Sequence, residues 1–117
     1  MAGFRDAARR FLAAGVPVAA ACGATLGLAL EGLLDDRAHT SNTAGYLASC
    51  GYAGANRFVD APVVTDGDLI TASGTAPAHF ARAIFDRLGS YDPGVAASWF
   101  RLYGDRDPAG FYELASA

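Results

Sequence analysis

Cys22 has the sequence surroundings of a catalytic nucleophile. The apolar run at residues 16–21 predicts a strand covered on both faces of a parallel sheet, and residues 23–30 predict a helix. Small neighbours such as Ala20 and Gly23 allow the sharp strand-to-helix turn on which hydrolases expose a nucleophile. A thiol there lies at a helix N-terminus, whose dipole favours the thiolate. The pattern predicts cysteine-based nucleophilic chemistry; the competing interpretation is a small buried core cysteine.

The histidines and the second cysteine are the other residues that could take part in chemistry. His39 follows Cys22 by 17 residues, which suits a Cys–His pair across adjacent strands; the alternative is a surface histidine that begins the next strand. Zinc bound by Cys22, His39, Cys50 and His79 is not expected, because no C-x-x-C or H-x₃-H spacing is present. Cys50 is interpreted as structural and His79 as solvent-facing. We therefore predict neither a metal nor another cofactor.

The composition predicts one globular domain over residues 1–117 and limits its chemistry. Hydrophobic residues make up 52% of the chain and charged residues 18%, a balance that is typical of a folded core. The net charge is −3 without a basic stripe, which argues against a nucleic-acid partner. All nine basic residues are arginine, so neither a Schiff base nor a P-loop lysine is possible within this sequence.

The longest apolar stretch, residues 12–30, is long enough for a membrane-spanning helix. Three glycines, a proline, a cysteine and a threonine interrupt it, so a strand followed by a helix explains it better. It also lacks the form of a signal peptide. Free cysteines without a secretory signal predict a reducing, cytoplasmic environment and no membrane partner.

Helical and strand patterns alternate along the chain, which predicts an α/β fold. The only strong parallel strand is at residues 16–21, and a doubly wound sheet needs several such strands side by side. We therefore infer that part of the sheet lies outside this chain or comes from another copy. Among the other expected elements is a short helix that Ser41 or Asn42 can cap and that runs to about residue 49. Further helices are expected at 4–14, 77–88, 92–103 and 107–114, with a short strand at 38–40 and a hairpin of residues 63–65 and 69–72 around Asp66-Gly67.

Seven blocks of sequence resemble the ThiJ/PfpI family, the class I glutamine amidotransferase-like group of flavodoxin-like domains. The resemblance implies a flavodoxin-like parallel sheet with flanking helices and a β-hairpin. It covers only the later, C-terminal portion of the family's domain, whose N-terminal strands precede the nucleophile. The blocks are VAAACGAT at 18–25, ALEGLLD at 29–35, HTSN at 39–42, YAGA at 52–55, FVDAP at 58–62, DGDLITASG at 66–74 and AP at 76–77.

The resemblance implies a nucleophilic thiol at Cys22 and an oxyanion-binding N–H at Gly23. Relatives also use an acidic residue on the first strand and a second oxyanion donor in a glycine-rich turn, and both belong to the half that this sequence lacks. Glu31 cannot replace the acid, because nine residues of helix place it roughly 13 Å from Cys22. Many relatives carry a histidine directly after the cysteine or in a later turn; Gly23 and Asn42 occupy these places.

Two functions follow from this resemblance. The first is cysteine-dependent hydrolysis, amidotransferase-like chemistry or the handling of reactive aldehydes, with a small-molecule substrate. The second is a truncated, non-catalytic relative that acts as a subunit or scaffold. Exposed sheet edges favour association with further copies or with a complementing N-terminal segment.

Overall fold

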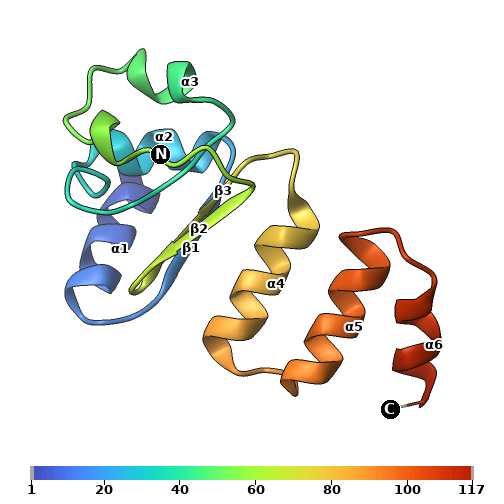
Figure 1. Ribbon diagram of the computed structural model, residues 1–117. Helices are drawn as coiled ribbons and strands as arrows, with labels where there is room; N and C mark the ends of the chain where they lie inside the picture. Colours follow the sequence, from blue (N-terminus) through green and yellow to red (C-terminus); the bar gives the residue numbers. More distant parts are fainter. Residues whose placement is uncertain (1, 117) are drawn as a thin grey trace. The chain divides into compact units, whose positions relative to one another are not determined.

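The computed structural model describes residues 2–116, which divide after Pro77 into two compact units (Figure 1). Within residues 2–116, every helix is too short or too polar to cross a membrane. The elements of the first unit are α1 (Ala2–Ala13), β1 (Val18–Ala21), α2 (Gly23–Leu30), α3 (Ala44–Ala48), the 3₁₀ turn η1 (Ala55–Arg57), β2 (Val63–Asp66) and β3 (Leu69–Ala72). Three helices follow, α4 (Pro77–Leu88), α5 (Pro93–Tyr103) and α6 (Ala109–Ser116).

The first unit is an α/β fold built on a small mixed sheet, as predicted. The strand order is β1-β3-β2; β1 runs parallel to β3, and β2 runs antiparallel to it. The N–H groups of Val18 and Cys22 donate to β3, at 2.8 Å to Asp68 O and 3.2 Å to Ala72 O. Because the hydrogen bonds to β3 occur at alternate residues, the backbone N–H groups of Ala19 and Ala21 point to the side of β1 that faces away from β3. Within residues 2–116 no strand pairs with that side of β1, so the inferred shortage of strands is confirmed.

The hairpin lies where the sequence predicted it, one residue out of register with the expected turn. Asp66 pairs with Leu69, so the two central turn residues are Gly67 and Asp68. Gly67 has φ of 58°, which glycine adopts without strain and which two-residue hairpin turns require. The Asp66 carboxylate also links the hairpin to the segment at Ala38, because its Oδ2 accepts the N–H of Ala38 at 2.8 Å.

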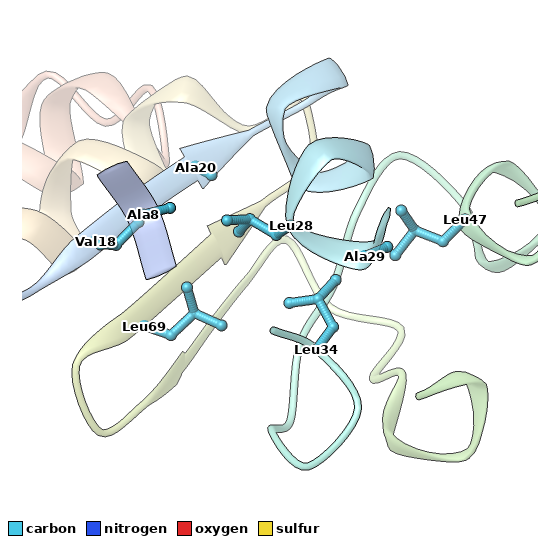
Figure 2. Close-up of a cluster of buried hydrophobic side chains, with 8 residues drawn as sticks. All are labelled: Ala8, Val18, Ala20, Leu28, Ala29, Leu34, Leu47 and Leu69. Carbon is cyan, nitrogen blue, oxygen red and sulfur yellow. The ribbon is translucent and has the colours of Figure 1, made fainter. Parts of the chain in front are cut away.

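The core of this unit lies between α1, α2 and one face of the sheet (Figure 2). Val18 and Ala20, two residues apart on β1, point into it, whereas Ala19 is exposed. The prediction of a strand covered on both faces is therefore wrong for the described residues, and β1 begins at Val18 instead of Val16. The cluster consists of Ala8, Val18, Ala20, Leu28, Ala29, Leu34, Leu47 and Leu69.

Helix α2 ends at Leu30, and a glycine turn follows it. Gly32 has φ of 77°, and its N–H donates to Ala29 O at 3.1 Å. The next N–H, of Leu33, donates to Leu28 O at 3.0 Å, which completes a Schellman motif. Farther along, Gly54 packs against the backbone that follows α2: a Cβ at Gly54 would lie only 2.3 Å from Leu34 O. Only glycine fits this contact.

Two predictions for residues 38–49 need correction. The expected strand at 38–40 is a single parallel bridge between His39 and Phe58. Helix α3 is capped by Thr43, whose Oγ1 accepts the N–H of Tyr46 at 3.1 Å, and not by Ser41 or Asn42. The reason is that the side chains of Ser41 and Asn42 make contacts with distant residues instead.

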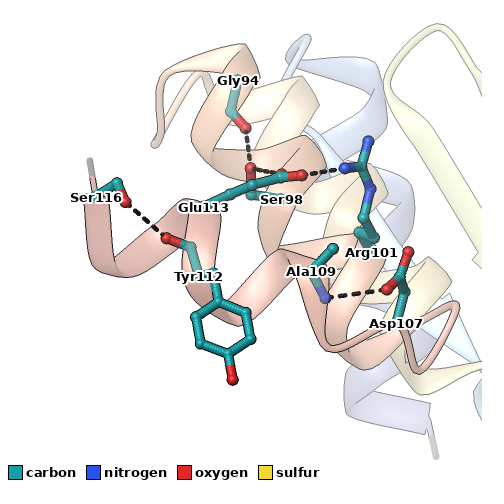
Figure 3. A network of polar contacts seen from close by, with 8 residues as sticks. All are labelled: Gly94, Ser98, Arg101, Asp107, Ala109, Tyr112, Glu113 and Ser116. Carbon is teal, nitrogen blue, oxygen red and sulfur yellow. Dashed lines mark hydrogen bonds and ion pairs between the residues drawn. The ribbon is translucent and has the colours of Figure 1, made fainter.

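Residues 78–116 form a helical unit held by aromatic and polar contacts. The Trp99 ring packs against Phe85 at 5.1 Å and Tyr103 at 5.2 Å between ring centroids. Helices α5 and α6 approach so closely at Gly110 that a Cβ there would lie 2.4 Å from Ser98 O, and only a residue without a side chain permits this. Glu113 links the two helices through Ser98 and Arg101 (Figure 3).

Candidate functional site

Cys22 occupies the sharp junction between β1 and α2 that the sequence predicted. Its backbone has φ of 56° and ψ of −126°, a region that residues with a Cβ rarely adopt and that costs about 1–3 kcal/mol. Its N–H still donates to Ala72 O at 3.2 Å, so the sheet hydrogen bonding continues into the turn. The side chain of Cys22 is exposed, which does not fit the alternative of a buried core cysteine.

Two buried hydroxyl groups form a hydrogen-bonded chain that ends on the carbonyl oxygen of the strained turn. Thr25 Oγ1 donates to the carbonyl oxygen of Cys22 at 2.6 Å and lies 2.7 Å from Ser41 Oγ. A hydroxyl has one proton, and the carbonyl can only accept, so Ser41 must donate to Thr25. Thr25 is 0% and Ser41 3% exposed, so little water competes for these bonds.

Asn42 and Gly74 lie against the sulfur of Cys22. Asn42 Nδ2 is 3.5 Å from Cys22 Sγ, and Asn42 Oδ1 accepts the N–H of Gly74 at 2.9 Å. A Cβ at Gly74 would lie 3.0 Å from Sγ, so the absence of a side chain leaves room for the thiol. The Gly23 N–H is at the first position of α2, where helix geometry provides no partner within the helix.

The structure does not bring His39 and Cys22 together. The His39 ring is 0% exposed, with Nδ1 2.7 Å from Arg37 O and Nε2 2.8 Å from the Tyr52 hydroxyl. Since a carbonyl can only accept, Nδ1 carries the proton in the neutral ring and Nε2 accepts from Tyr52. Both nitrogens are thus engaged away from the thiol. The alternative of a surface histidine is also wrong, because the ring lies inside the first unit.

Tyr52, the partner of His39, has a perturbed hydroxyl. Burial raises the pKa of Tyr52 above its ordinary value, and the nearby Cys50 and Asp35 raise it further. The neutral phenol is therefore favoured, which suits donation of its proton to His39. This part of the unit is structural in character.

The remaining candidate residues lie in structural contacts. Cys50 is half-buried against the core, and the His79 ring packs on Phe100 at 4.8 Å. Glu31 pairs with Arg5 at 3.8 Å, and Glu113 with Arg101. Among the described residues no group of three or more His, Cys, Asp or Glu side chains could hold a metal ion.

The sequence analysis missed the contact of Asn42 with the sulfur and the Thr25–Ser41 pair. The family resemblance offered a signal for Asn42, because it places that residue where many relatives have a histidine. Nothing in the local pattern connects Gly74 with Cys22, since the two are 52 residues apart and meet only through the parallel pairing of β1 and β3.

Known proteins resemble this chain in both sequence and structure. The DJ-1/PfpI family matches residues 2–87. The uncharacterized protease YoaZ of Bacillus subtilis is 42% identical over 102 residues, which cover 86% of this chain and 49% of YoaZ. The uncharacterized protease YdeA of the same organism is 40% identical over 75 residues, covering 62% of this chain and 38% of YdeA.

Two crystal structures share the fold. A ThiJ/PfpI family protein from Bacillus anthracis superposes with a TM-score of 0.90 at 35% identity, over 96% of this chain and 54% of that one. The DJ-1 superfamily protein Atu0886 from Agrobacterium tumefaciens gives a TM-score of 0.76 at 33% identity, over 88% of this chain and 56% of that one. The chain thus spans about half the length of YoaZ and of both structural neighbours, and less of YdeA.

Proposed function

This chain belongs to the DJ-1/PfpI family, and from that premise we propose that Cys22 is a nucleophile toward carbonyl carbon, in cysteine-dependent hydrolysis or amidotransferase-like chemistry. The observation that carries the proposal is an exposed thiol on a strained strand-to-helix turn. Strain of this kind persists where the surrounding structure enforces it, and such positions cluster at functional sites. YoaZ and YdeA are named proteases, which makes amide carbonyls the first substrates to test.

The proposed reaction begins with attack of the Cys22 thiolate on the carbonyl carbon. The sulfur–carbon bond forms while the carbonyl π electrons move to oxygen, which accepts the Gly23 N–H. Collapse of this intermediate breaks the bond to the leaving amine or alcohol, which takes a proton from water or a neighbouring acid. Water then hydrolyses the thioester and regenerates the thiol. A reactive aldehyde would undergo the same first step and stop at a thiohemiacetal.

A complementing segment is part of this proposal. The family's acidic residue and second oxyanion donor belong to the half of the domain that the sequence of this chain does not contain. β1 has an unpaired side within residues 2–116, and its carboxyl end leads directly into Cys22. A parallel strand added there would bring its own carboxyl end, and the residues that follow it, beside the thiol.

The alternative function is a non-catalytic subunit or scaffold. The observation that favours it is the coverage of about half of YoaZ and of the two structural neighbours, together with the open side of β1. Such a chain would use the same side of β1 for self-association or for binding a complementing chain. Light scattering of the purified chain separates these cases, since a stable monomer at all concentrations argues against self-association.

The test of the nucleophile uses the two free cysteines as an internal comparison. Cys22 is exposed and Cys50 half-buried, so peptide mapping after iodoacetamide treatment reports both thiols in one sample. An activated Cys22 reacts rapidly below about pH 7, ahead of Cys50. An activated ester should leave an acyl group on Cys22, and Cys22→Ala should abolish it. Labelling of Cys22 only above about pH 8, without acylation, would contradict the proposal.

A further inference from the structure

We propose that Asn42 is the positioning residue of the Cys22 thiol, holding the sulfur through a neutral N–H donor whose direction is set by Gly74. The inference rests on the proposed function of Cys22 and adds the group that orients its sulfur. The evidence is the bridge that one side chain makes, from Gly74 N through Oδ1 at 2.9 Å to Cys22 Sγ through Nδ2 at 3.5 Å.

The orientation of the Asn42 carboxamide follows from its hydrogen bond to Gly74. A backbone N–H can donate only to the oxygen of a carboxamide, never to its NH₂ group. With Oδ1 on Gly74, the NH₂ group must face Sγ. A donor aimed at sulfur stabilises the thiolate more than the thiol, because charge strengthens the hydrogen bond.

The residues that precede Asn42 fix its position on the sheet. The N–H of Thr40 donates to Thr71 Oγ1 on β3 at 2.9 Å, and Thr40 Oγ1 donates to Ala61 O at 2.9 Å. Ser41 follows, with its hydroxyl 2.7 Å from Thr25 Oγ1 in the buried chain below the turn. Both residues are buried, at 1% and 3% exposure. The hydrogen bonds of Thr40 and Ser41 therefore fix the backbone from which the Asn42 carboxamide extends.

A carboxamide gives the sulfur a different partner from a histidine. It does not titrate, so its hydrogen bond to the thiolate has the same strength at every pH, and it cannot remove the thiol proton. The Tyr46 hydroxyl of α3 also lies at this end of α2, 3.7 Å from the position of a Cβ on Gly23.

The experiment measures iodoacetamide alkylation of Cys22 against pH in the full chain and three variants. Asn42→Asp keeps an oxygen for the Gly74 N–H but turns the group facing Sγ into an anion. We expect its rate at pH 7 to fall about tenfold and its pH profile to move to higher pH. Asn42→Ala removes the donor without adding charge, so a decrease of about threefold is expected. Tyr46→Phe is the control and should stay within about twofold of the unmodified chain.

A second measurement needs no variant and therefore does not depend on folding of the mutants. In the ¹⁵N-labelled chain, the side-chain NH₂ signal of Asn42 should move when Cys22 is alkylated, because alkylation removes the thiolate that its N–H faces. Equal rates for Asn42→Asp and the unmodified chain, or an NH₂ signal that ignores alkylation, would overturn the proposal. Failure of ester acylation with these effects intact would instead refute only the proposed function.

Discussion

The backbone strain at Cys22 predicts that glycine is more stabilising than alanine at this position. Both Cys22→Gly and Cys22→Ala remove the sulfur and its contact with Asn42, so the comparison isolates the effect of a Cβ at φ of 56° and ψ of −126°. Relief of strain contributes about 1–3 kcal/mol in favour of glycine. The greater freedom of glycine in the unfolded chain offsets about 0.5–1 kcal/mol of this. The glycine variant should therefore be more stable by about 1 kcal/mol.

Urea unfolding followed by circular dichroism measures this difference. Trp99 lies in the unit that begins at Ala78, so its fluorescence reports the unfolding of that unit beside the circular dichroism signal of the whole chain. Ala24→Gly, two residues into α2, is the matched control, because glycine inside a helix lowers stability by about 1 kcal/mol. The reasoning is refuted if Cys22→Gly is less stable than Cys22→Ala by an amount similar to this control.

Three further substitutions test contacts described above. Gly74→Ala places a methyl 3.0 Å from Cys22 Sγ, and we expect a loss of about 1–3 kcal/mol in unfolding free energy and slower alkylation; unchanged alkylation would argue against the close contact. Gly54→Ala forces a carbon to 2.3 Å from Leu34 O, so urea unfolding should show a loss above about 2 kcal/mol, and a neutral effect would contradict the packing. Tyr52→Phe tests the raised pKa of Tyr52. A raised folded-state pKa stabilises the fold below the ordinary value of about 10, and this stabilisation is lost as pH rises further. Between about pH 9 and pH 11, the free energy of unfolding of the phenylalanine variant, measured with urea at several pH values, should therefore fall less than that of the unmodified chain. Equal losses in both proteins would refute the raised pKa of Tyr52.

The strand-to-helix turn at Cys22 and the hairpin could be predicted because their sequence signals are local. A run of small apolar residues ending at Cys22, followed by Gly23, describes the turn without knowledge of distant contacts. Likewise Asp66 and Gly67 indicate a hairpin wherever strand-like residues flank them. Such positions depend on backbone conformation, which neighbouring residues largely determine. The family resemblance then explained why strands were missing.

The partners of His39 and Asn42 could not be predicted because they depend on folding of distant segments. His39 meets Tyr52, 13 residues on, only because the chain returns beside it at the Phe58 bridge. The local sequence favours Asn42 as a helix cap, which is the usual local use of its side chain. In the fold, the Gly74 N–H donates to the side-chain oxygen of Asn42, and Thr43 caps α3 instead. Polar side chains with several possible partners are decided by tertiary structure.

The alternating hydrogen bonds of β1 should leave a pattern in amide hydrogen exchange. Val18 and Cys22 donate their N–H groups to β3, whereas those of Ala19 and Ala21 point to the side with no partner strand among residues 2–116. Deuterium should thus enter this strand at every second residue, quickly at Ala19 and Ala21 and slowly between them. Docking of a further strand would protect the fast pair, so these two alanines report whether the sheet beside Cys22 has been completed.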